Sequence, residues 1–162
     1  MGLRTILHDS DPTLRKQSRE VTNFDRRLHD LLDDLAETVA HANGAGLAAP
    51  QAGILRRVCV INVDGLIELV NPRITASDGT QEGAEGCLSI PGRTGLVKRP
   101  NRVIVEAQNR HGKSVVLEGE GFLARALCHE LDHLNGVLYT DVMERFMTLE
   151  ELAELDKEDE EE

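Results

Sequence analysis

A pentapeptide in the C-terminal third of the chain carries the residue types needed for metal chemistry. It reads His129-Glu130-Leu131-Asp132-His133. Side chains four positions apart lie on the same face of a helix, so both imidazoles can reach one divalent ion. Glu130 then lies near a water molecule on that ion, where it can take and return a proton. The pentapeptide predicts a hydrolase that uses a metal.

The residues around the pentapeptide favour a packed helix over an exposed one. Buried polar groups without partners cost roughly 1–3 kcal/mol each, so two buried imidazoles one turn apart need a common partner such as a metal. The alternative is a polar helix whose histidines are surface residues. This alternative is less favoured because apolar residues occupy most of the helix around the motif. They are Leu123, Ala126, Leu127, Leu131 and Leu134.

A catalytic zinc-type site commonly has three protein ligands, so a third ligand must come from elsewhere in the chain. Cys87, Cys59, Cys128, His111 and several carboxylates are candidates. Cys128 adjoins the first histidine and points about 100° away around the helix, whereas Cys59 lies in an apolar strand pattern typical of the core. Cys87 follows a glycine, where backbone and ligand can approach closely, and is the preferred candidate.

Composition and charge indicate one soluble globular domain. The chain has 162 residues, of which 40% are apolar and 29% charged. The formal net charge is -11, but residues 150–162 carry nine acidic side chains and one Lys, which leaves -3 for the body. Three cysteines do not make a disulfide framework, and no apolar run approaches the roughly 20 residues of a membrane span. We expect a cytoplasmic protein without a nucleic-acid surface, which would need clustered Lys and Arg.

The pattern predicts a helix over Pro12 to Glu20 and an amphipathic helix from about Asp25 to Asn43. Strands are expected over 57–63 and 66–74, joined by Asp64-Gly65, and over 102–108 and 114–118. Residues 75–100, rich in Gly and Pro, are expected to be irregular with short strands. The metal helix is expected over 121–135. Thr148 to Glu151 reads as a capping box, and the acidic run 156–162 is expected to be frayed or disordered.

Three separated segments, in register, resemble the signatures of the peptide deformylase family. They are Gly44-Ala45-Gly46-Leu47-Ala48-Ala49-Pro50-Gln51, Glu85-Gly86-Cys87-Leu88-Ser89 and His129-Glu130-Leu131-Asp132-His133-Leu134-Asn135-Gly136. The resemblance runs from near the N-terminus to about residue 145. Alone, Gly44-x-Gly46 would indicate only a turn that ends a helix.

The resemblance implies a fold and an activity. The fold is α+β, a compact single domain with antiparallel sheets packed around the central helix of the pentapeptide, an N-terminal helix and an acidic C-terminal helix or tail. Residues 1–147 would form the catalytic domain, and 148–162 the partly disordered acidic segment. The activity is removal of the N-formyl group from the initiator methionine of new bacterial polypeptides, with release of formate.

The resemblance also implies roles for individual residues. Cys87, His129 and His133 would hold the metal, and Glu130 would be the general acid and base. The Gln51 side-chain amide and the Leu88 backbone N–H would bind the developing oxyanion. Backbone groups would align the peptide, and an apolar pocket would take the methionine side chain. The expected peptide-binding residues are Ala45, Gly46 and Gly86, and the expected pocket residues are Phe122, Ala126 and Ala45.

One thiolate and two imidazoles suit Zn, Fe, Co or Ni, and the resemblance implies Fe(II) as the physiological ion. Arg125 is unusual in an apolar pocket wall, and we expect its stem to lie along the pocket with its charge in water. Arg99 is expected to pair with Asp132 or Glu85. The other histidines, His8, His29, His41 and His111, are expected in turns or at the surface.

Two other functions remain open at this point. One is a zinc peptidase with a His or Glu as third ligand, and the other is an inactive metal-binding relative with a closed four-ligand site. We expect a monomer that acts on formyl-methionine peptides. The acidic tail would be repelled by ribosomal RNA, so contact with the ribosome would use another surface.

Overall fold

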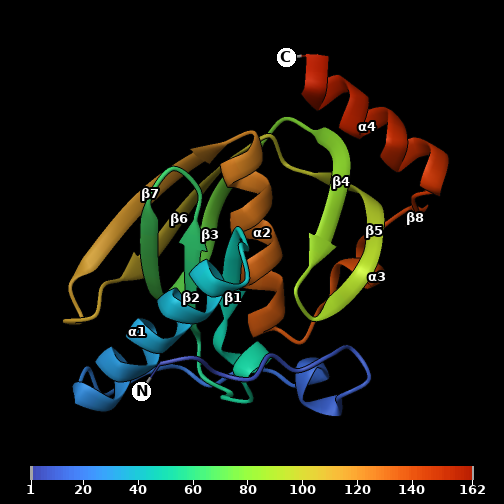
Figure 1. Cartoon of the computed structure of the whole chain (residues 1–162). Coiled ribbons are helices and arrows are strands. Elements are labelled where there is room, and N and C mark those ends of the chain that lie inside the picture. Colours follow the sequence, from blue (N-terminus) through green and yellow to red (C-terminus); the bar gives the residue numbers. More distant parts are fainter. Residues whose placement is uncertain (1, 162) are drawn as a thin grey trace.

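The computed structural model describes residues 2–161, and for residues 158–161 it describes only the backbone. Two antiparallel sheets enclose one central helix, α2 (Phe122–Leu134), as Figure 1 shows. The larger sheet has the order β1-β2-β3-β6-β7 and the smaller one β4-β5-β8. The strands are β1 (Gly46–Ala48), β2 (Val58–Asn62), β3 (Leu66–Asp78), β4 (Gln81–Cys87), β5 (Ile90–Arg99), β6 (Arg102–Gln108), β7 (Ser114–Glu120) and β8 (Arg145–Phe146). The predicted α+β single domain is confirmed.

The helices surround these sheets. They are the 3-10 turns η1 (Pro12–Arg15) and η2 (Ala49–Ala52) and the α-helices α1 (Arg26–His41), α3 (Tyr139–Val142) and α4 (Leu149–Glu161), besides α2. No helix in the described part of the chain is both long and apolar enough to cross a membrane.

Helix α1 forms where the sequence predicts it. The Asp25 carboxylate accepts a hydrogen bond from the Leu28 backbone N–H and caps its first turn. Its apolar stripe is fully buried and packs on the outer side of β1 and β2, with Leu47 and Val58 in the same cluster. This layer supports strand β1 from behind, and β1 borders the functional site.

Helix α2 is the central element because it is apolar around most of its circumference. Leu127 and Leu134 are fully buried against residues of β2, β3 and β6, among them Ile61 and Val105. Gly119 on β7 leaves room for this packing, since a Cβ there would lie 2.8 Å from the Leu127 side chain. The pentapeptide is thereby held rigidly between the sheets.

The expectation of irregular structure over 75–100 is wrong. Strand β3 continues to Asp78, and β4 and β5 form a long hairpin that pairs from Gln81 and Arg99 to Cys87 and Ile90. The glycines there serve close packing as well as turns. A Cβ on Gly95 would lie 2.7 Å from the Tyr139 ring, so this strand position must be glycine.

The predicted helix over Pro12 to Glu20 is also wrong beyond its first turn, since only η1 forms. The Asp11 side chain accepts from the Thr13 N–H as an N-cap does. After η1 the backbone is extended because tertiary partners take its hydrogen bonds. The Ser18 N–H donates to the Leu134 carbonyl at 2.8 Å. The backbone of Arg19 forms an isolated parallel β-bridge with that of Arg56.

The C-terminal capping box is confirmed. The Thr148 hydroxyl accepts from the Glu151 N–H at 3.1 Å, and Glu151 accepts from the Thr148 N–H at 3.0 Å. The helix extends as far as Glu161, although the run of like charges from Asp156 predicts fraying or disorder. Glu162 lies outside the described residues.

Replacement of Gly136 by alanine is expected to destabilise the fold. Gly136 ends α2 with φ +74°, and a Cβ there would overlap the backbone carbonyl of Arg15. The left-handed conformation alone costs an alanine roughly 1–2 kcal/mol, and the overlap adds to this cost. We expect a loss of at least about 2 kcal/mol in the free energy of unfolding, measured by urea denaturation. Gly53→Ala (φ +82°, nearest atom 3.9 Å from the added Cβ) is the control, because it shares the left-handed conformation without the overlap, and an equal loss there would contradict the role of the overlap.

Candidate metal centre and active site

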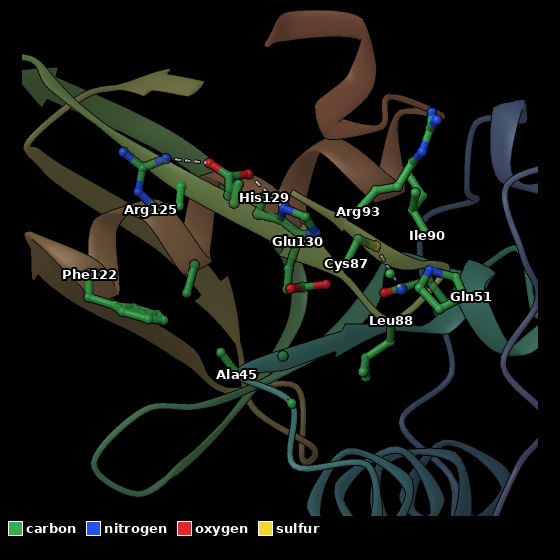
Figure 2. A pocket seen from close by; sticks show the side chains of 18 residues that line it. Ala45, Gln51, Cys87, Leu88, Ile90, Arg93, Phe122, Arg125, His129 and Glu130 are labelled. Atoms are coloured by element: carbon green, nitrogen blue, oxygen red, sulfur yellow. Dashed lines mark hydrogen bonds and ion pairs between the residues drawn. The ribbon is translucent and has the colours of Figure 1, made fainter. Parts of the chain in front are cut away.

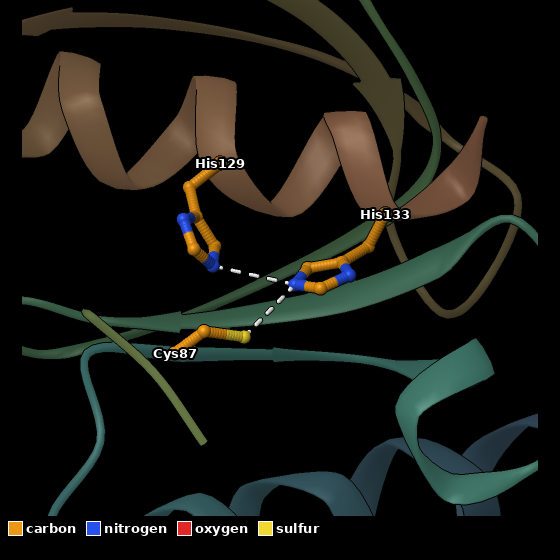
Figure 3. Close-up of side chains that lie close together, drawn as sticks. All are labelled: Cys87, His129 and His133. Carbon is orange, nitrogen blue, oxygen red and sulfur yellow. Dashed lines mark hydrogen bonds between the residues drawn. The ribbon is translucent and has the colours of Figure 1, made fainter. Parts of the chain in front are cut away.

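Three candidate ligands converge on one point, as Figure 3 shows. The donor atoms of Cys87, His129 and His133 all lie within 4.8 Å of one another. Nε2 of His133 lies 3.3 Å from Nε2 of His129 and 3.4 Å from Sγ of Cys87. Helix α2 supplies the two imidazoles, and the end of β4 supplies the thiol.

The spacing of these atoms fits a tetrahedral ion. Bonds of about 2.3 Å to sulfur and about 2.05 Å to nitrogen separate two nitrogens by about 3.3 Å and sulfur from nitrogen by about 3.5 Å. The observed separations of 3.3 and 3.4 Å match both edges. Three donors leave one position of such an ion for water or substrate. Cys59 and Cys128 are not part of this group. Cys59 is buried in the core between the sheet and α2, as predicted.

Glu85 fixes the first imidazole. Nδ1 of His129 donates to Oε1 of Glu85 at 2.7 Å, so Nε2 is left with its lone pair toward the cluster. Arg99 donates to both oxygens of Glu85, at 2.7 and 3.0 Å. Burial favours the neutral acid, but the hydrogen bonds from Arg99 and His129, together with the charge of Arg99, outweigh it and lower the pKa of Glu85 to about 2.

Glu85 has a role that the sequence patterns do not predict. It was expected only as a possible partner of Arg99. The available signal was its position two residues before Cys87, since alternate strand residues share a face. Arg99 also pairs with Asp132 at 2.6 Å, so both expected pairings form and Asp132 is an ion-pair partner.

Glu130 lies beside the cluster in the wall of the pocket. Its side chain is only 4% exposed, and Oε1 has no partner among the described residues. Burial is the main cause that raises the pKa of Glu130 to about 7. Gly46 on β1 makes room for this carboxylate, since a Cβ there would lie 2.6 Å from Oε2.

Gln51 reaches the cluster from η2. Its Oε1 accepts from the Ala48 N–H at 2.9 Å, which orients the amide. Nε2 then donates to Ser89 Oγ at 3.0 Å and lies 3.6 Å from Sγ of Cys87. The structure thus brings together Gln51 and the thiol, although they are 36 positions apart in the chain.

A pocket of about 350 Å³ opens onto this group. Figure 2 shows Ala45, Phe122, Glu130 and Leu88 around it, with α2 on one side and strands on the others. All the residues expected to bind peptide or methionine are in its lining, namely Ala45, Gly46, Gly86, Phe122 and Ala126. Phe122 is 57% exposed, an unusual exposure for an aromatic side chain that lines a cavity.

The expectation for Arg125 is wrong. Its charge is not in water, since the residue is only 7% exposed. Nη1 donates to Oε2 of Glu85 at 2.7 Å, so the guanidinium is held inside the pocket wall (Figure 2). The partner lies 40 positions away on another element, where helix periodicity gives no information.

The site and fold together define a class. Two imidazoles on one helix turn, a cysteine from a strand and a buried carboxylate in the wall of one pocket are a set of groups that suits a metal-dependent hydrolase.

Comparisons with known proteins identify the family. A family model described as polypeptide deformylase matches residues 3–148. Peptide deformylase of Acetivibrio thermocellus is 56% identical over 94% of this chain and 90% of its own length. The crystal structure of peptide deformylase from Thermotoga maritima superposes with a TM-score of 0.86 at 41% identity, covering 88% of this chain and 99% of that chain. Peptide deformylase from Legionella pneumophila gives 0.85 at 43% identity, covering 88% and 86%.

The chain belongs to the polypeptide deformylase family. It is an enzyme of the metal-dependent hydrolase class.

Proposed function

We propose that this chain removes the N-formyl group from the formyl-methionine of newly made polypeptides, releasing formate. The observation that carries the proposal is the Cys87, His129 and His133 group, with Glu130 beside it in the wall of the same pocket. The direct test is formate release from formyl-Met-Ala by the purified, metal-loaded protein. No formate from a metal-loaded sample would refute this assignment.

Cys87, His129 and His133 would hold the metal, and the remaining polar groups would carry the proton and charge changes. A divalent ion there supplies Lewis acidity and lowers the pKa of a water molecule toward about 7. Glu130 takes a proton from the attacking water and delivers it to the leaving nitrogen. Attack on the formyl carbon places negative charge on its oxygen. Gln51 Nε2 and the Leu88 N–H are the proposed donors to that oxygen, each worth about 3 kcal/mol by analogy with such donors elsewhere.

The peptide would lie between two strand edges. Strand β1 is at the edge of the larger sheet and β4 at the edge of the smaller one, and residues of both line the pocket. An extended peptide can add to such edges through main-chain hydrogen bonds. We assign this role to Ala45 and Gly46 on the β1 side and Gly86 on β4. Phe122 and Ala126 would then contact the methionine side chain.

The two rival functions have less support. A zinc peptidase would need a His or Glu as third ligand, but among the side chains that the structure describes, those of residues 2–157, the one group of suitable donors is Cys87 with the two histidines. A closed structural site would need a fourth ligand, and it gives no role to Glu130 or Gln51, both buried beside the cluster.

Replacement of Gly46 by alanine is expected to impair catalysis through Glu130. The added Cβ would lie 2.6 Å from Oε2 of Glu130 and force the carboxylate to move. We expect formate release to fall at least about tenfold, since displacements near 1 Å in an active site have effects of this size or larger. The double variant Gly46→Ala/Glu130→Ala is the control, compared with Glu130→Ala alone, because a loss that acts through the carboxylate adds little once that carboxylate is gone. A further loss of about tenfold in the double variant would show that the displacement of Glu130 is not the cause.

Fe(II) is the proposed physiological ion, with Zn, Ni or Co as replacements. The thiolate and two imidazoles accept all four. We expect protein prepared in air to turn over formyl-Met-Ala more slowly than anaerobic, iron-loaded protein, with metal content measured on both. Equal rates at equal metal content would contradict iron as the working ion.

We further propose a cytoplasmic bacterial monomer that meets formyl-methionine peptides near the ribosome. The charges of the tail, nine acidic residues against one Lys, disfavour contact with RNA through residues 150–162. The division into a catalytic domain over 1–147 and an acidic segment over 148–162 likewise stays a prediction.

A further inference from the structure

Ser89 places a buried hydroxyl next to the metal cluster, and none of the steps proposed above uses it. It lies between β4 and β5, two positions after Cys87, and it is fully buried. Its Oγ accepts a hydrogen bond from Nε2 of Gln51 at 3.0 Å. Gln51 and Cys87 line the pocket, whereas Ser89 does not. Any effect of this hydroxyl on a ligand in the pocket would therefore pass through Gln51.

The side-chain amide of Gln51 is held at both of its polar atoms. The Ala48 N–H donates to Oε1 at 2.9 Å, which fixes the nitrogen on the opposite side of the amide. A primary amide nitrogen carries two hydrogens, and Ser89 accepts one of them. The other contact of Nε2 is with Sγ of Cys87 at 3.6 Å (Figure 2). The second hydrogen is thus the one left for the cluster and for a formyl oxygen bound there.

The backbones of Gln51 and Ser89 are held by the same outer segment. The Leu7 N–H donates to the Gln51 carbonyl at 2.7 Å, and the Asp9 N–H donates to the Ser89 carbonyl at 2.9 Å. Because Leu7 and Asp9 are only two positions apart, this segment ties η2 to the turn between β4 and β5. The hydrogen bond between the two side chains therefore joins two backbones whose separation is already fixed.

We propose that Ser89 is a positioning residue for deformylation, whose hydroxyl engages one amide hydrogen of Gln51 and so directs the other toward the formyl oxygen. This inference rests on the proposed function, in which Nε2 of Gln51 stabilises that oxygen. A donor that is oriented in advance does not have to turn when negative charge develops, and such preorganisation is the source of its effect. Because the charge develops on attack, the hydroxyl would matter in the transition state and not in the substrate complex.

A purely structural role for Ser89 predicts a different result. The hydroxyl would then only satisfy a buried amide hydrogen and hold the turn between β4 and β5. Its loss would lower stability, and any effect on turnover would be the same whichever residue stands at position 51. A positioning role makes the effect on turnover depend on Gln51.

The test is a double-mutant cycle with Ser89→Ala and Gln51→Ala, measured as kcat and KM for formyl-Met-Ala on samples of equal metal content. We expect Ser89→Ala to lower kcat about five- to tenfold, the effect of one buried hydrogen bond, with KM within about twofold. In the Gln51→Ala background the same change should lower kcat less than about twofold. Ser18→Ala is the matched control and should keep the wild-type kcat, since Ser18 is also buried but its Oγ has no hydrogen-bond partner among the described residues.

An NMR measurement tests the contact independently of activity. In the isotope-labelled, zinc-loaded protein, the side-chain amide signal of Gln51 is identified by its absence from Gln51→Ala. We expect this signal to shift in Ser89→Ala, where one amide hydrogen loses its acceptor, and to keep its position in Ser18→Ala.

The outcomes separate the positioning role from deformylation itself. Equal losses of kcat from Ser89→Ala with and without Gln51, a change in KM alone, or a Gln51 signal that does not shift would overturn the positioning role and leave deformylation intact. Absence of formate from formyl-Met-Ala in the metal-loaded wild type would overturn both. If Ser89→Ala does not fold, Ser89→Cys retains most of the side-chain volume with only a weak acceptor, and we expect it to show the same loss of kcat. Wild-type kcat in Ser89→Cys would then refute the inference.

Discussion

Replacement of Glu130 by alanine is expected to lower formate release from formyl-Met-Ala by roughly 10²–10⁴-fold while the metal stays bound. This range is what a positioned general acid and base contributes. Glu130 lies in the pocket wall beside the cluster but is not one of the three converging donors, so its loss removes proton transfer and leaves the ligands in place. The measurement is kcat/KM together with the metal content of the same sample.

Glu130→Gln is the matched variant for this test. It preserves the size of the side chain in the space that Gly46 leaves for it, but it cannot take up a proton. We expect Gln to be as inactive as Ala. Wild-type rates in either variant would show that another group acts as the base, whereas loss of metal from both would place Glu130 among the groups that hold the ion.

Much of the site was predictable because it depends on local spacing. The two imidazoles share a helix face by periodicity alone, and the apolar residues of α1 and α2 mark their buried stripes. The other candidate site residues were predicted from the three segments that resemble the family signatures. The thiol was preferred among several candidates from its glycine-flanked segment, and the structure places it within reach of both histidines.

What could not be predicted depends on contacts between distant elements. The β4-β5 hairpin has glycines that sequence patterns assign to irregular structure, yet Gly95 is needed because Tyr139 packs on the strand. Arg125 was expected to point to water, but Glu85 binds it inside the wall. In both cases the local structure depends on contact with a residue of another element. The pattern of a single sequence does not predict which distant residues will be in contact.

Replacement of Cys87 by alanine is expected to abolish stable metal binding and to reduce formate release at least about a hundredfold. Loss of residues that only support metal ligands costs 10–100-fold, and a direct ligand should cost at least as much. With the thiolate gone, two imidazoles remain, and no other donor in the described residues is close enough to complete a group of three. Metal content after dialysis against a weak chelator is the primary measurement, with thermal unfolding to show that the fold persists.

Cys128→Ala is the control for this experiment. It removes a buried thiol next to His129 from the same helix, but Cys128 does not belong to the converging group. We expect it to keep its metal and most of its activity, so that any loss in Cys87→Ala reflects ligation and not the absence of a thiol. If Cys87→Ala kept one metal per chain through dialysis, the thiolate would not be a ligand. A peptidase-type centre with a His or Glu as third ligand would then become the better account of the site.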